Sequence, residues 1–164
     1  MEIRDAKLED GEQVADVYNY YIQQTHHTFE TDPLEAEEMQ KRISVVTQKY
    51  PFLVAEDEGQ ILGYAYATQF KLRQAYEYAS EVSIYVRNAA KQKGIGTQLY
   101  MKLFDELSET DIHAVVAGIS LPNDASVLFH ERLGFEKVAH FKEVGYKLGR
   151  WIDVGYWEKI LRVY

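Results

Sequence analysis

Three groups of residues in this sequence have side chains whose types and spacing could support a reaction. Glu81 begins a short strand-like run in which polar and apolar residues alternate. A basic turn with two glycines follows at residues 91–97, directly before an amphipathic stretch. The third group, spaced at i, i+3 and i+7 of a predicted helix, consists of Asn123, Ser126 and His130. Together the groups offer a carboxylate base, an anion site and a polar helical stripe.

The turn at residues 91–97 has the features of an anion-binding loop. Gly94 and Gly96 let a ligand approach the main chain closely, and the first N–H groups of the following helix have no internal partners. The positive end of the helix dipole adds to the attraction for phosphate. Two common phosphate loops are excluded, because Leu99 stands where a dinucleotide-binding fold needs a third glycine and no Gly-Lys-Ser/Thr follows. The turn therefore predicts a phosphate site of another kind.

Alternation over residues 81–86 divides the predicted strand into two faces. Glu81 shares one face with Ser83 and Tyr85, whereas the other face is entirely apolar. A glutamate at this place either lies at the exposed end of the strand or is poised in a cleft. The strand alone favours the exposed position, so a functional role requires a partner elsewhere in the chain.

The stretch at residues 123–135 contains candidates for that partner. Its polar stripe is flanked by the apolar residues Val127, Phe129 and Leu133, which predicts that the stripe faces inward. The inward polar groups then need partners that an apolar core does not supply. The simpler alternative makes Asn123 a helix N-cap and His130 a satisfied core histidine, and it is favoured for an isolated helix.

The composition limits the class of protein. The chain has 164 residues, 46% hydrophobic and 13% aromatic, which is typical of one globular domain with a substantial core. A net charge of -8 disfavours sequence-independent binding of nucleic acid. The lack of cysteine excludes disulfides, thiolate metal sites and a cysteine acyl-enzyme. Charged residues soon after Met1 and the lack of a long apolar run predict no membrane segment and a cytoplasmic location.

The hydrophobic pattern predicts strands and helices in a single domain over residues 1–164. Strands are expected at 3–6, 52–56, 61–70, 81–86 and 114–119, and further strands in the tail 135–163, interrupted by Gly145 and Gly149. A first helix ends near Gln24, a loop covers 26–33, and further helices cover 34–48, a stretch from about residue 94, and 124–133. A helix crosses between the strands near Tyr85 and Val116, which makes them parallel, whereas hairpins are antiparallel. The expected fold class is α/β, with a mixed, mostly antiparallel sheet flanked by helices.

The runs 81–100 and 123–135 together resemble the GNAT superfamily of N-acetyltransferases. Four further pieces are similar to its phosphinothricin and methionine sulfoximine acetyltransferase branch: residues 29–31, 71–76, 121–124, and 145–147 with 151–155. These separated motifs cover nearly the whole chain, so the resemblance is more specific than a glycine loop alone. It implies the acetyltransferase (GNAT) fold.

The resemblance also implies a reaction. It is the transfer of an acetyl group from acetyl-CoA to the amine of a small amino-acid-like substrate, such as phosphinothricin or methionine sulfoximine, by direct attack in a ternary complex. The glycine turn would then hold the CoA pyrophosphate, in agreement with its electrostatics. The pantetheine arm would lie between the strand and the polar helical stripe. The implied cofactor-binding residues are Ile84, Tyr85, Val86, Lys91, Gln92, Lys93, Gly94, Ile95, Gly96, Thr97, Asn123 and Ser126.

Glu81 and His130 are the implied catalytic residues. Many members of the superfamily have a tyrosine at the position of His130 that is thought to protonate the leaving thiolate, whereas the phosphinothricin branch is similar to this chain in having histidine. A histidine titrates near neutral pH and could act as acid or base. Glu81 is the other candidate base, because an α-amine with a pKa of about 7.7–8.0 has only a mildly acidic proton to lose.

The implied substrate-binding residues are Phe29, Lys71, Arg73 and Tyr76. The two basic residues could bind a substrate carboxylate, although a solvated pair of charges is an equally favoured account. The chain departs from its relatives in two places. Glu30 stands where arginine often follows the phenylalanine, which weakens the case for phosphinothricin, and Lys91 stands where the loop usually begins with Gln or Arg.

Other functions stay open from the sequence. A non-catalytic CoA-binding sensor would leave Glu81 and His130 with structural roles, and a protein N-acetyltransferase would act on a peptide amine. His26 and His27 form a poor metal pair without a third ligand and more plausibly line a cleft, so no metal is expected. The expected partner is a small-molecule amine, with neither nucleic acid nor membrane, and a homodimer is an open possibility.

Overall fold

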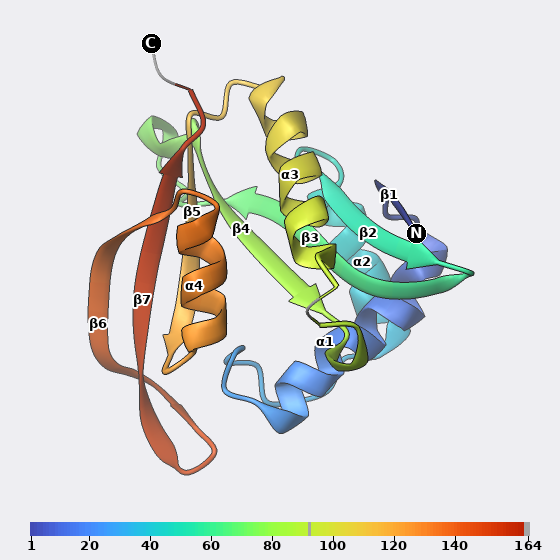
Figure 1. The fold of residues 1–164 in the computed structure, drawn as a ribbon, viewed down its shortest axis with the longest axis horizontal. Coiled ribbons are helices and arrows are strands. Elements are labelled where there is room, and N and C mark those ends of the chain that lie inside the picture. Colours follow the sequence, from blue (N-terminus) through green and yellow to red (C-terminus); the bar gives the residue numbers. More distant parts are fainter. Residues whose placement is uncertain (92, 163–164) are drawn as a thin grey trace.

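A single seven-stranded sheet forms the centre of the computed structural model, which describes residues 1–91 and 93–162 (Figure 1). Every neighbouring pair of its strands is antiparallel except β4 and β5, which are parallel. The predicted mixed, mostly antiparallel sheet is therefore confirmed. In sheet order the strands are β1 (Glu2–Asp5), β2 (Phe52–Asp57), β3 (Gln60–Gln69), β4 (Ala79–Val86), β5 (Ala114–Leu121), β7 (Arg150–Ile160) and β6 (Glu136–Lys147).

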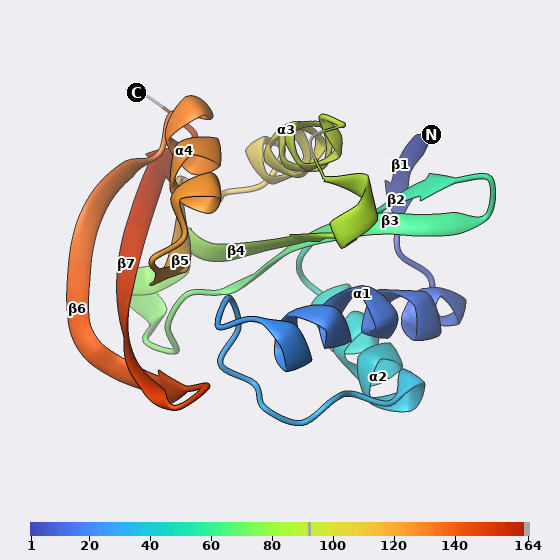
Figure 2. The same ribbon diagram turned by 60° about the horizontal axis from the view of Figure 1, so that its bottom comes forward.

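The four α-helices of the described residues cover both faces of the sheet (Figure 2). Helices α1 (Gly11–Gln24) and α2 (Ala36–Val46) lie on one face, and α3 (Ile95–Ser108) and α4 (Asp124–Arg132) lie on the other. Each face has its own core, because apolar residues alternate between the two sides of each strand. Leu99, Leu103 and Leu107 lie along one side of α3 and are fully buried against the sheet.

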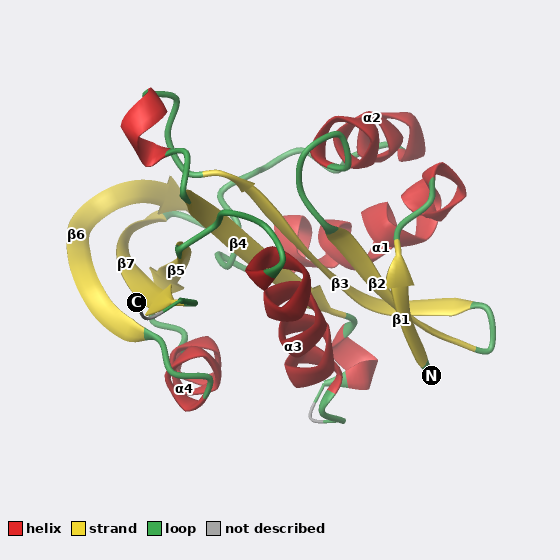
Figure 3. Ribbon diagram, turned by 90° about the horizontal axis from the view of Figure 1, so that it is seen from above, coloured by secondary structure: helices red, strands yellow, loops and turns green. Residues whose placement is uncertain are grey.

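Strands β4 and β5 are paired over a short distance only. Their parallel register joins Ala79 to Ala114, Ser80 to Val115 and Glu81 to Val116. After Glu81 the two strands diverge, as seen in the view from above (Figure 3). Strand β4 stays paired with β3 as far as Val86, so its other edge has no partner strand from residue 82 onward. The divergence opens the middle of the sheet.

The tail differs from the sequence prediction at Gly145. This glycine does not interrupt a strand but lies within β6, and only Gly149 lies in the turn before β7, with a φ of +75°. A Cβ on Gly145 would be 2.4 Å from the ring of Phe29. The absence of a side chain therefore allows the loop after α1 to pack closely against β6.

The described residues contain no helix that is both long and apolar enough to cross a bilayer.

Candidate active site

A cavity of about 470 Å³ lies where β4 and β5 diverge. Its walls come from the diverging parts of both strands, from the first turns of α3 and from α4. Most of the predicted cofactor-binding residues line it, although they come from three separate segments of the chain. They are Ile84, Tyr85, Val86, Lys91, Gly94, Ile95, Gly96, Thr97, Asn123 and Ser126, and His130 joins them.

The N-terminus of α3 presents main-chain groups to this cavity. Gly94 is the N-cap residue with a φ of +74°, a conformation that favours glycine, and no side chain caps the helix there. The first N–H groups of α3 are therefore open to a ligand, at the positive end of the helix dipole. At Gly96 a Cβ would be 3.2 Å from the Phe129 ring, so this glycine lets α3 lie close to α4. The geometry fits the predicted phosphate site.

The basic residues of the turn have different surroundings. The Lys91 Nζ lies 5.2 Å from the ring centroid of Tyr21 and 5.9 Å from that of Tyr20, in cation–π geometry. Desolvation lowers the pKa of Lys91 from its ordinary value. Lys93 is exposed and does not line the cavity, and Gln92 lies outside the described residues. Lys91 is thus the basic residue of the turn that the described structure brings to the cavity.

The polar stripe of α4 faces inward as predicted. Ser126 N donates to the Asn123 Oδ1 at 3.3 Å, so Asn123 is an N-cap, and His130 is buried. The His130 Nδ1 lies 2.8 Å from the carbonyl oxygen of Ser126, which can only accept, so Nδ1 holds the proton. Its Nε2 then accepts from the Tyr100 hydroxyl at 3.1 Å. Both alternatives from the sequence therefore apply. Asn123 caps the helix and His130 is hydrogen-bonded in the core, and both residues also line the cavity.

Burial fixes the protonation state of His130. Desolvation lowers its pKa below the ordinary value, and the hydrogen bond to the Ser126 carbonyl offsets only part of that effect. The imidazole is therefore neutral near pH 7, with both ring nitrogens engaged. A neutral, doubly engaged imidazole is a poor candidate for taking a further proton.

Tyr100 was not among the predicted site residues. It is completely buried in α3, lines the cavity and forms a hydrogen bond with His130. Its position among leucines on an apolar helix face suggests only core packing. The sequence does contain one indication that Tyr100 could pair with His130. A buried tyrosine hydroxyl requires a hydrogen-bond partner, and His130 is a polar residue predicted to face inward. Tyr21 of α1 also lines the cavity and was not predicted. His27, from the loop after α1, lines it too, in agreement with the prediction that this histidine lines a cleft.

Glu81 lies at the point where the two strands separate. It pairs with Thr68 of β3 and Val116 of β5, so β4 is a central strand at this position and the exposed placement favoured by the strand alone is wrong. The side chain is half-buried, and desolvation raises its pKa above the usual value of 4.5. No hydrogen bond or ion pair to this carboxylate occurs within residues 1–91 and 93–162. Glu81 is thus a carboxylate with an elevated pKa and free acceptor oxygens.

The predicted substrate-binding residues lie outside the 470 Å³ cavity. Lys71 is exposed, with its Nζ 5.4 Å from the ring centroids of both Phe70 and Tyr76. Arg73 is exposed in the same loop before β4, and Phe29 packs over β6. The structure therefore brings Lys71 and Tyr76 together but does not gather all four residues around one cavity.

The loop after α1 is held by its histidine. The His26 Nε2 lies 2.9 Å from the Pro122 carbonyl oxygen, and Arg150 donates to its Nδ1 at 2.7 Å. Both ring nitrogens are therefore used in tying the loop to the end of β5 and to β7. His27 lines the cavity, and burial lowers its pKa to about 4. The histidine pair thus shapes a cleft, and the described residues contain no cluster of three metal-ligating side chains.

Comparison with known proteins identifies the family. Residues 3–155 match the family model described as "Acetyltransferase (GNAT) domain", and the chain belongs to this family. It is 38% identical to the phosphinothricin N-acetyltransferase of Streptomyces viridochromogenes, over 97% of this chain and 87% of that protein. It is 34% identical to the L-methionine sulfoximine/L-methionine sulfone acetyltransferase of Pseudomonas aeruginosa, over 93% of this chain and 90% of that one.

Solved structures agree with this assignment. A GNAT superfamily phosphinothricin acetyltransferase from Sinorhizobium meliloti, in complex with AcCoA, has a TM-score of 0.93 at 34% identity, covering 97% of this chain and 87% of that one. A ribosomal-protein-alanine N-acetyltransferase from Brucella melitensis has a TM-score of 0.94 at 34% identity, covering 98% and 99%. The comparisons confirm the predicted family, its fold, the N-acetyltransferase class and acetyl-CoA as the cosubstrate.

Proposed function

We propose that this protein transfers the acetyl group of acetyl-CoA to the α-amine of a small amino-acid-like substrate, by direct attack within a ternary complex. The observation that supports this most strongly is the divergence of β4 and β5 directly after Glu81. The unpaired strand edge and the open N-terminus of α3 line this gap, and Glu81, whose pKa is raised, is the last residue of β4 that pairs with β5 before the gap begins.

The residues of the cavity fit the parts of acetyl-CoA. The N-terminus of α3, with Gly94, Gly96 and the side chain of Lys91, suits the pyrophosphate. The unpaired edge of β4 offers main-chain groups to the amide-containing pantetheine arm, and Asn123 and Ser126 lie on the opposite wall. The cosubstrate supplies an activated thioester, and the N–H groups of β4 would stabilise the oxyanion that develops on its carbonyl.

Glu81 is the proposed base. The amine nitrogen forms a bond to the thioester carbonyl carbon, the carbon–sulfur bond breaks, and the amine proton passes to Glu81 directly or through water. His130 is disfavoured for this step because Tyr100 and Ser126 already occupy both of its ring nitrogens. The buried pair of Tyr100 and His130 instead forms part of the cavity wall. The lack of cysteine agrees with direct transfer rather than a cysteine acyl-enzyme.

The relatives support an amino-acid-like acceptor. The two closely matching curated enzymes act, by their names, on phosphinothricin and on methionine sulfoximine or sulfone. Lys71 and Arg73 are proposed to attract the substrate carboxylate, with Phe29 and Tyr76 contributing ring contacts. A second candidate is acetylation of a protein amine. The Brucella structure, which is 34% identical to this chain, is named as a ribosomal-protein-alanine N-acetyltransferase.

The test is incubation of the purified protein with acetyl-CoA and a panel of amino acids, followed by mass spectrometry of the products. The panel includes phosphinothricin, methionine sulfone and common L-amino acids, and an alanine-initiated peptide competes with them. An N-acetylated amino acid is the expected product. Preferential acetylation of the peptide would support the second candidate, and binding of CoA with no acetylated product would make the protein a sensor.

The assembly and location are also proposals. Exposed apolar side chains gather on the β6–β7 hairpin, including Tyr146, Trp151 and Leu148, which favours a homodimer through this hairpin. A small-molecule substrate and a cytoplasmic location follow from the sequence predictions. Neither nucleic acid nor a membrane is a proposed partner.

A further inference from the structure

His27 brings a polar ring to the wall of the 470 Å³ cavity. The side chain is half-buried, and neither of its ring nitrogens forms a hydrogen bond within residues 1–91 and 93–162. Its ring neighbours are aromatic, with the ring centroid of Tyr21 at 6.3 Å and that of His26 at 5.0 Å. Because partly buried polar groups are normally hydrogen-bonded, the imidazole of His27 has the capacity to bind a ligand in this cavity.

The main chain on both sides of His27 is held by residues distant in the sequence. The carbonyl oxygen of His26 accepts from the Ser120 Oγ at 2.7 Å, and that of Thr28 accepts from the Lys147 Nζ at 2.8 Å. Ser120 belongs to β5 and Lys147 to β6. The loop is thus tied to two strands directly beside His27, whose own ring is not needed for the attachment.

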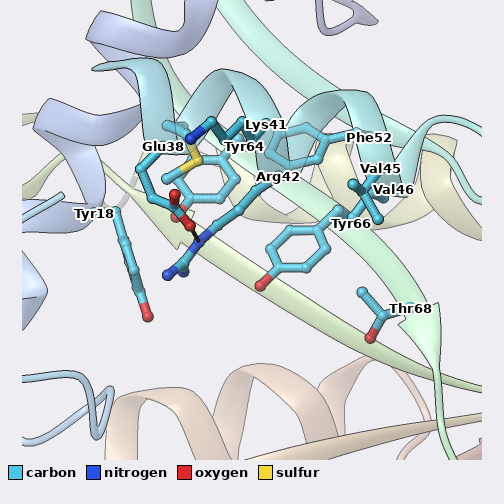
Figure 4. A pocket seen from close by; sticks show the side chains of 11 residues that line it. Tyr18, Glu38, Lys41, Arg42, Val45, Val46, Phe52, Tyr64, Tyr66 and Thr68 are labelled. Atoms are coloured by element: carbon cyan, nitrogen blue, oxygen red, sulfur yellow. Dashed lines mark hydrogen bonds and ion pairs between the residues drawn. The ribbon is translucent and has the colours of Figure 1, made fainter. Parts of the chain in front are cut away.

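The far end of this loop is anchored on α1 and α2. Arg42 of α2 donates to both carboxylate oxygens of Glu30, from Nη1 at 2.8 Å and from Nη2 at 2.6 Å. Arg42 and Tyr18 line a second cavity, of about 340 Å³, between α2 and strands β2 and β3 (Figure 4). The Tyr18 hydroxyl also donates to Glu30. A loop held at both ends keeps His27 pre-organised at the wall of the larger cavity.

The surroundings of His27 keep its ring neutral. Burial lowers the pKa of His27 to about 4, and the charges of His26, Lys91 and Lys147 act in the same direction. The described residues that line the cavity include no carboxylate that could pair with an imidazolium. Near pH 7 one ring nitrogen is therefore a donor and the other an acceptor. An amide group matches this pair, because it has both a carbonyl oxygen and an N–H, whereas phosphate oxygens only accept.

His27 lies near the end of the unpaired β4 edge. Its ring neighbour Tyr21 donates its hydroxyl to the carbonyl oxygen of Val86, the last residue of β4. The same tyrosine ring lies 5.2 Å from the Lys91 Nζ. The strand edge and the basic turn therefore meet beside His27. The Val86 carbonyl is already occupied there, and the ring nitrogens of His27 are still available.

We propose that His27 is a further binding residue for acetyl-CoA, and that its neutral ring forms a hydrogen bond with an amide group of the pantetheine arm. This role rests on the proposed function, which puts acetyl-CoA in this cavity. Lys91 and the N-terminus of α3 suit the pyrophosphate, so His27 serves the uncharged part of the same molecule. A contact made equally before and during acetyl transfer changes the KM for acetyl-CoA and leaves kcat unaltered.

The first measurement is calorimetric titration of the protein with CoA. His27→Phe keeps an aromatic ring without its nitrogens, and its Kd is expected to be about fivefold higher than that of the wild type, the scale of one hydrogen bond. His27→Asn and His27→Gln keep a neutral donor and acceptor, and at least one of them should bind within about twofold of the wild type. Equal weakening by all three variants would assign the effect to ring packing and overturn the proposal.

His140→Phe is the matched control, because His140 is exposed on β6 and does not line the cavity. Its Kd for CoA should equal that of the wild type. Thermal melting checks that each variant is folded. An unchanged Kd in a folded His27→Phe protein would also overturn the proposal.

A truncated acetyl donor separates the arm from the phosphates. S-acetyl-pantetheine keeps the thioester and both amides but has neither the pyrophosphate nor the nucleotide. His27→Phe is expected to lower kcat/KM about fivefold with this donor and with acetyl-CoA, whereas Lys91→Gln lowers it with acetyl-CoA only. The KM for the amine should stay the same in His27→Phe. A loss confined to acetyl-CoA, or a change in the amine KM instead, would contradict the contact with the arm.

The dependence on pH provides an independent check. With a pKa of about 4, His27 stays neutral from pH 6 to 8, so the Kd ratio of His27→Phe to the wild type should be constant over this range. A ratio that rises as the pH falls would show that His27 gains a proton and contacts a phosphate, against the proposal. The titration with CoA needs no amine. Lack of turnover with every amine would therefore overturn the proposed function, while the Kd values still decide the role of His27.

Discussion

At the scale of residues, the local environment of Glu81 determines its proposed role. The carboxylate is half-buried, has no partner among the described residues and has a pKa raised by desolvation. A base of higher pKa takes a proton more readily, provided that it is still ionised at the working pH. Desolvation therefore makes Glu81 a stronger base than an exposed glutamate.

Glu81→Gln is expected to lower kcat/KM for the amine by about 10²- to 10⁴-fold, the usual contribution of a general base. The raised pKa of Glu81 also determines how activity changes with pH. Because the pKa of Glu81 is raised, wild-type activity falls with decreasing pH at a value above the ordinary 4.5, and this acid limb disappears in the variant. Steady-state kinetics from pH 5 to 9 measure it, with the exposed Glu136→Gln as control. Retention of both the rate and the acid limb would exclude Glu81 as the base.

Tyr100 and His130 form a buried pair in which each satisfies the other. Tyr100→Phe is expected to reduce the free energy of unfolding by about 1–3 kcal/mol, because His130 Nε2 would be left without a donor. Urea denaturation at pH 7 measures the change. The exposed Tyr146→Phe should show none, and a Tyr100→Phe protein as stable as wild type would show that the hydrogen bond is dispensable.

The sequence could identify these site residues only in part. Spacing predicted the inward stripe of Asn123, Ser126 and His130, because helical periodicity is a local property. It could not predict Tyr100 as the partner of His130, since the two residues meet only when α3 and α4 pack side by side. The burial of Glu81 was also missed, because a strand's central position depends on neighbours distant in sequence.

At the scale of elements, the N-terminus of α3 is the part of the site that local sequence defines best. Gly94 supplies the left-handed turn, and the free N–H groups of α3 then face the cavity. Lys91 adds a positive charge that is held over the rings of Tyr21 and Tyr20. This position keeps the ammonium near the cavity with less freedom than a solvated lysine has.

Lys91→Gln is therefore expected to raise the KM for acetyl-CoA about fivefold, equivalent to about 1 kcal/mol, with kcat nearly unchanged. Because the interaction is electrostatic, the difference from wild type should shrink as salt is added. Lys102→Gln, at an exposed position of α3, is the matched control. Identical KM values for Lys91→Gln and wild type at low salt would remove Lys91 from the phosphate site.

The parallel pairing of β4 and β5 followed from the crossover helix, but their divergence did not. A crossover fixes the direction of a strand, whereas the length over which two strands stay paired depends on how both halves of the sheet pack. Only three residue pairs join β4 to β5, while β5 and β7 pair over eight. The cavity that results from this divergence could be expected from the family resemblance but not from hydrophobic patterning.

At the scale of the whole molecule, the fold was largely predictable because each element has a clear local pattern. The net charge of the chain is -8, so the basic turn is a local feature. Several exposed apolar side chains lie on the β6–β7 hairpin. There Tyr146 and Trp151 are 61% and 63% exposed and lie in contact, with ring centroids 4.9 Å apart. Exposed rings in contact are typical of an interaction surface.

Trp151→Glu is expected to convert a dimer into a monomer, because a carboxylate at an apolar interface loses its hydration without gaining a partner. Size-exclusion chromatography with light scattering measures the mass of both proteins at the same concentration. Lys142→Glu, on the same hairpin but without an apolar ring to lose, is the control. A wild-type protein of monomer mass would contradict the proposed dimer.

The most direct test of the central claim is the rate of CoA release as the concentrations of acetyl-CoA and an accepted amino acid are both varied. Direct transfer in a ternary complex predicts release that depends on the amine, with reciprocal plots that intersect. Parallel plots, or equal release without an amine, would contradict direct transfer to a bound substrate.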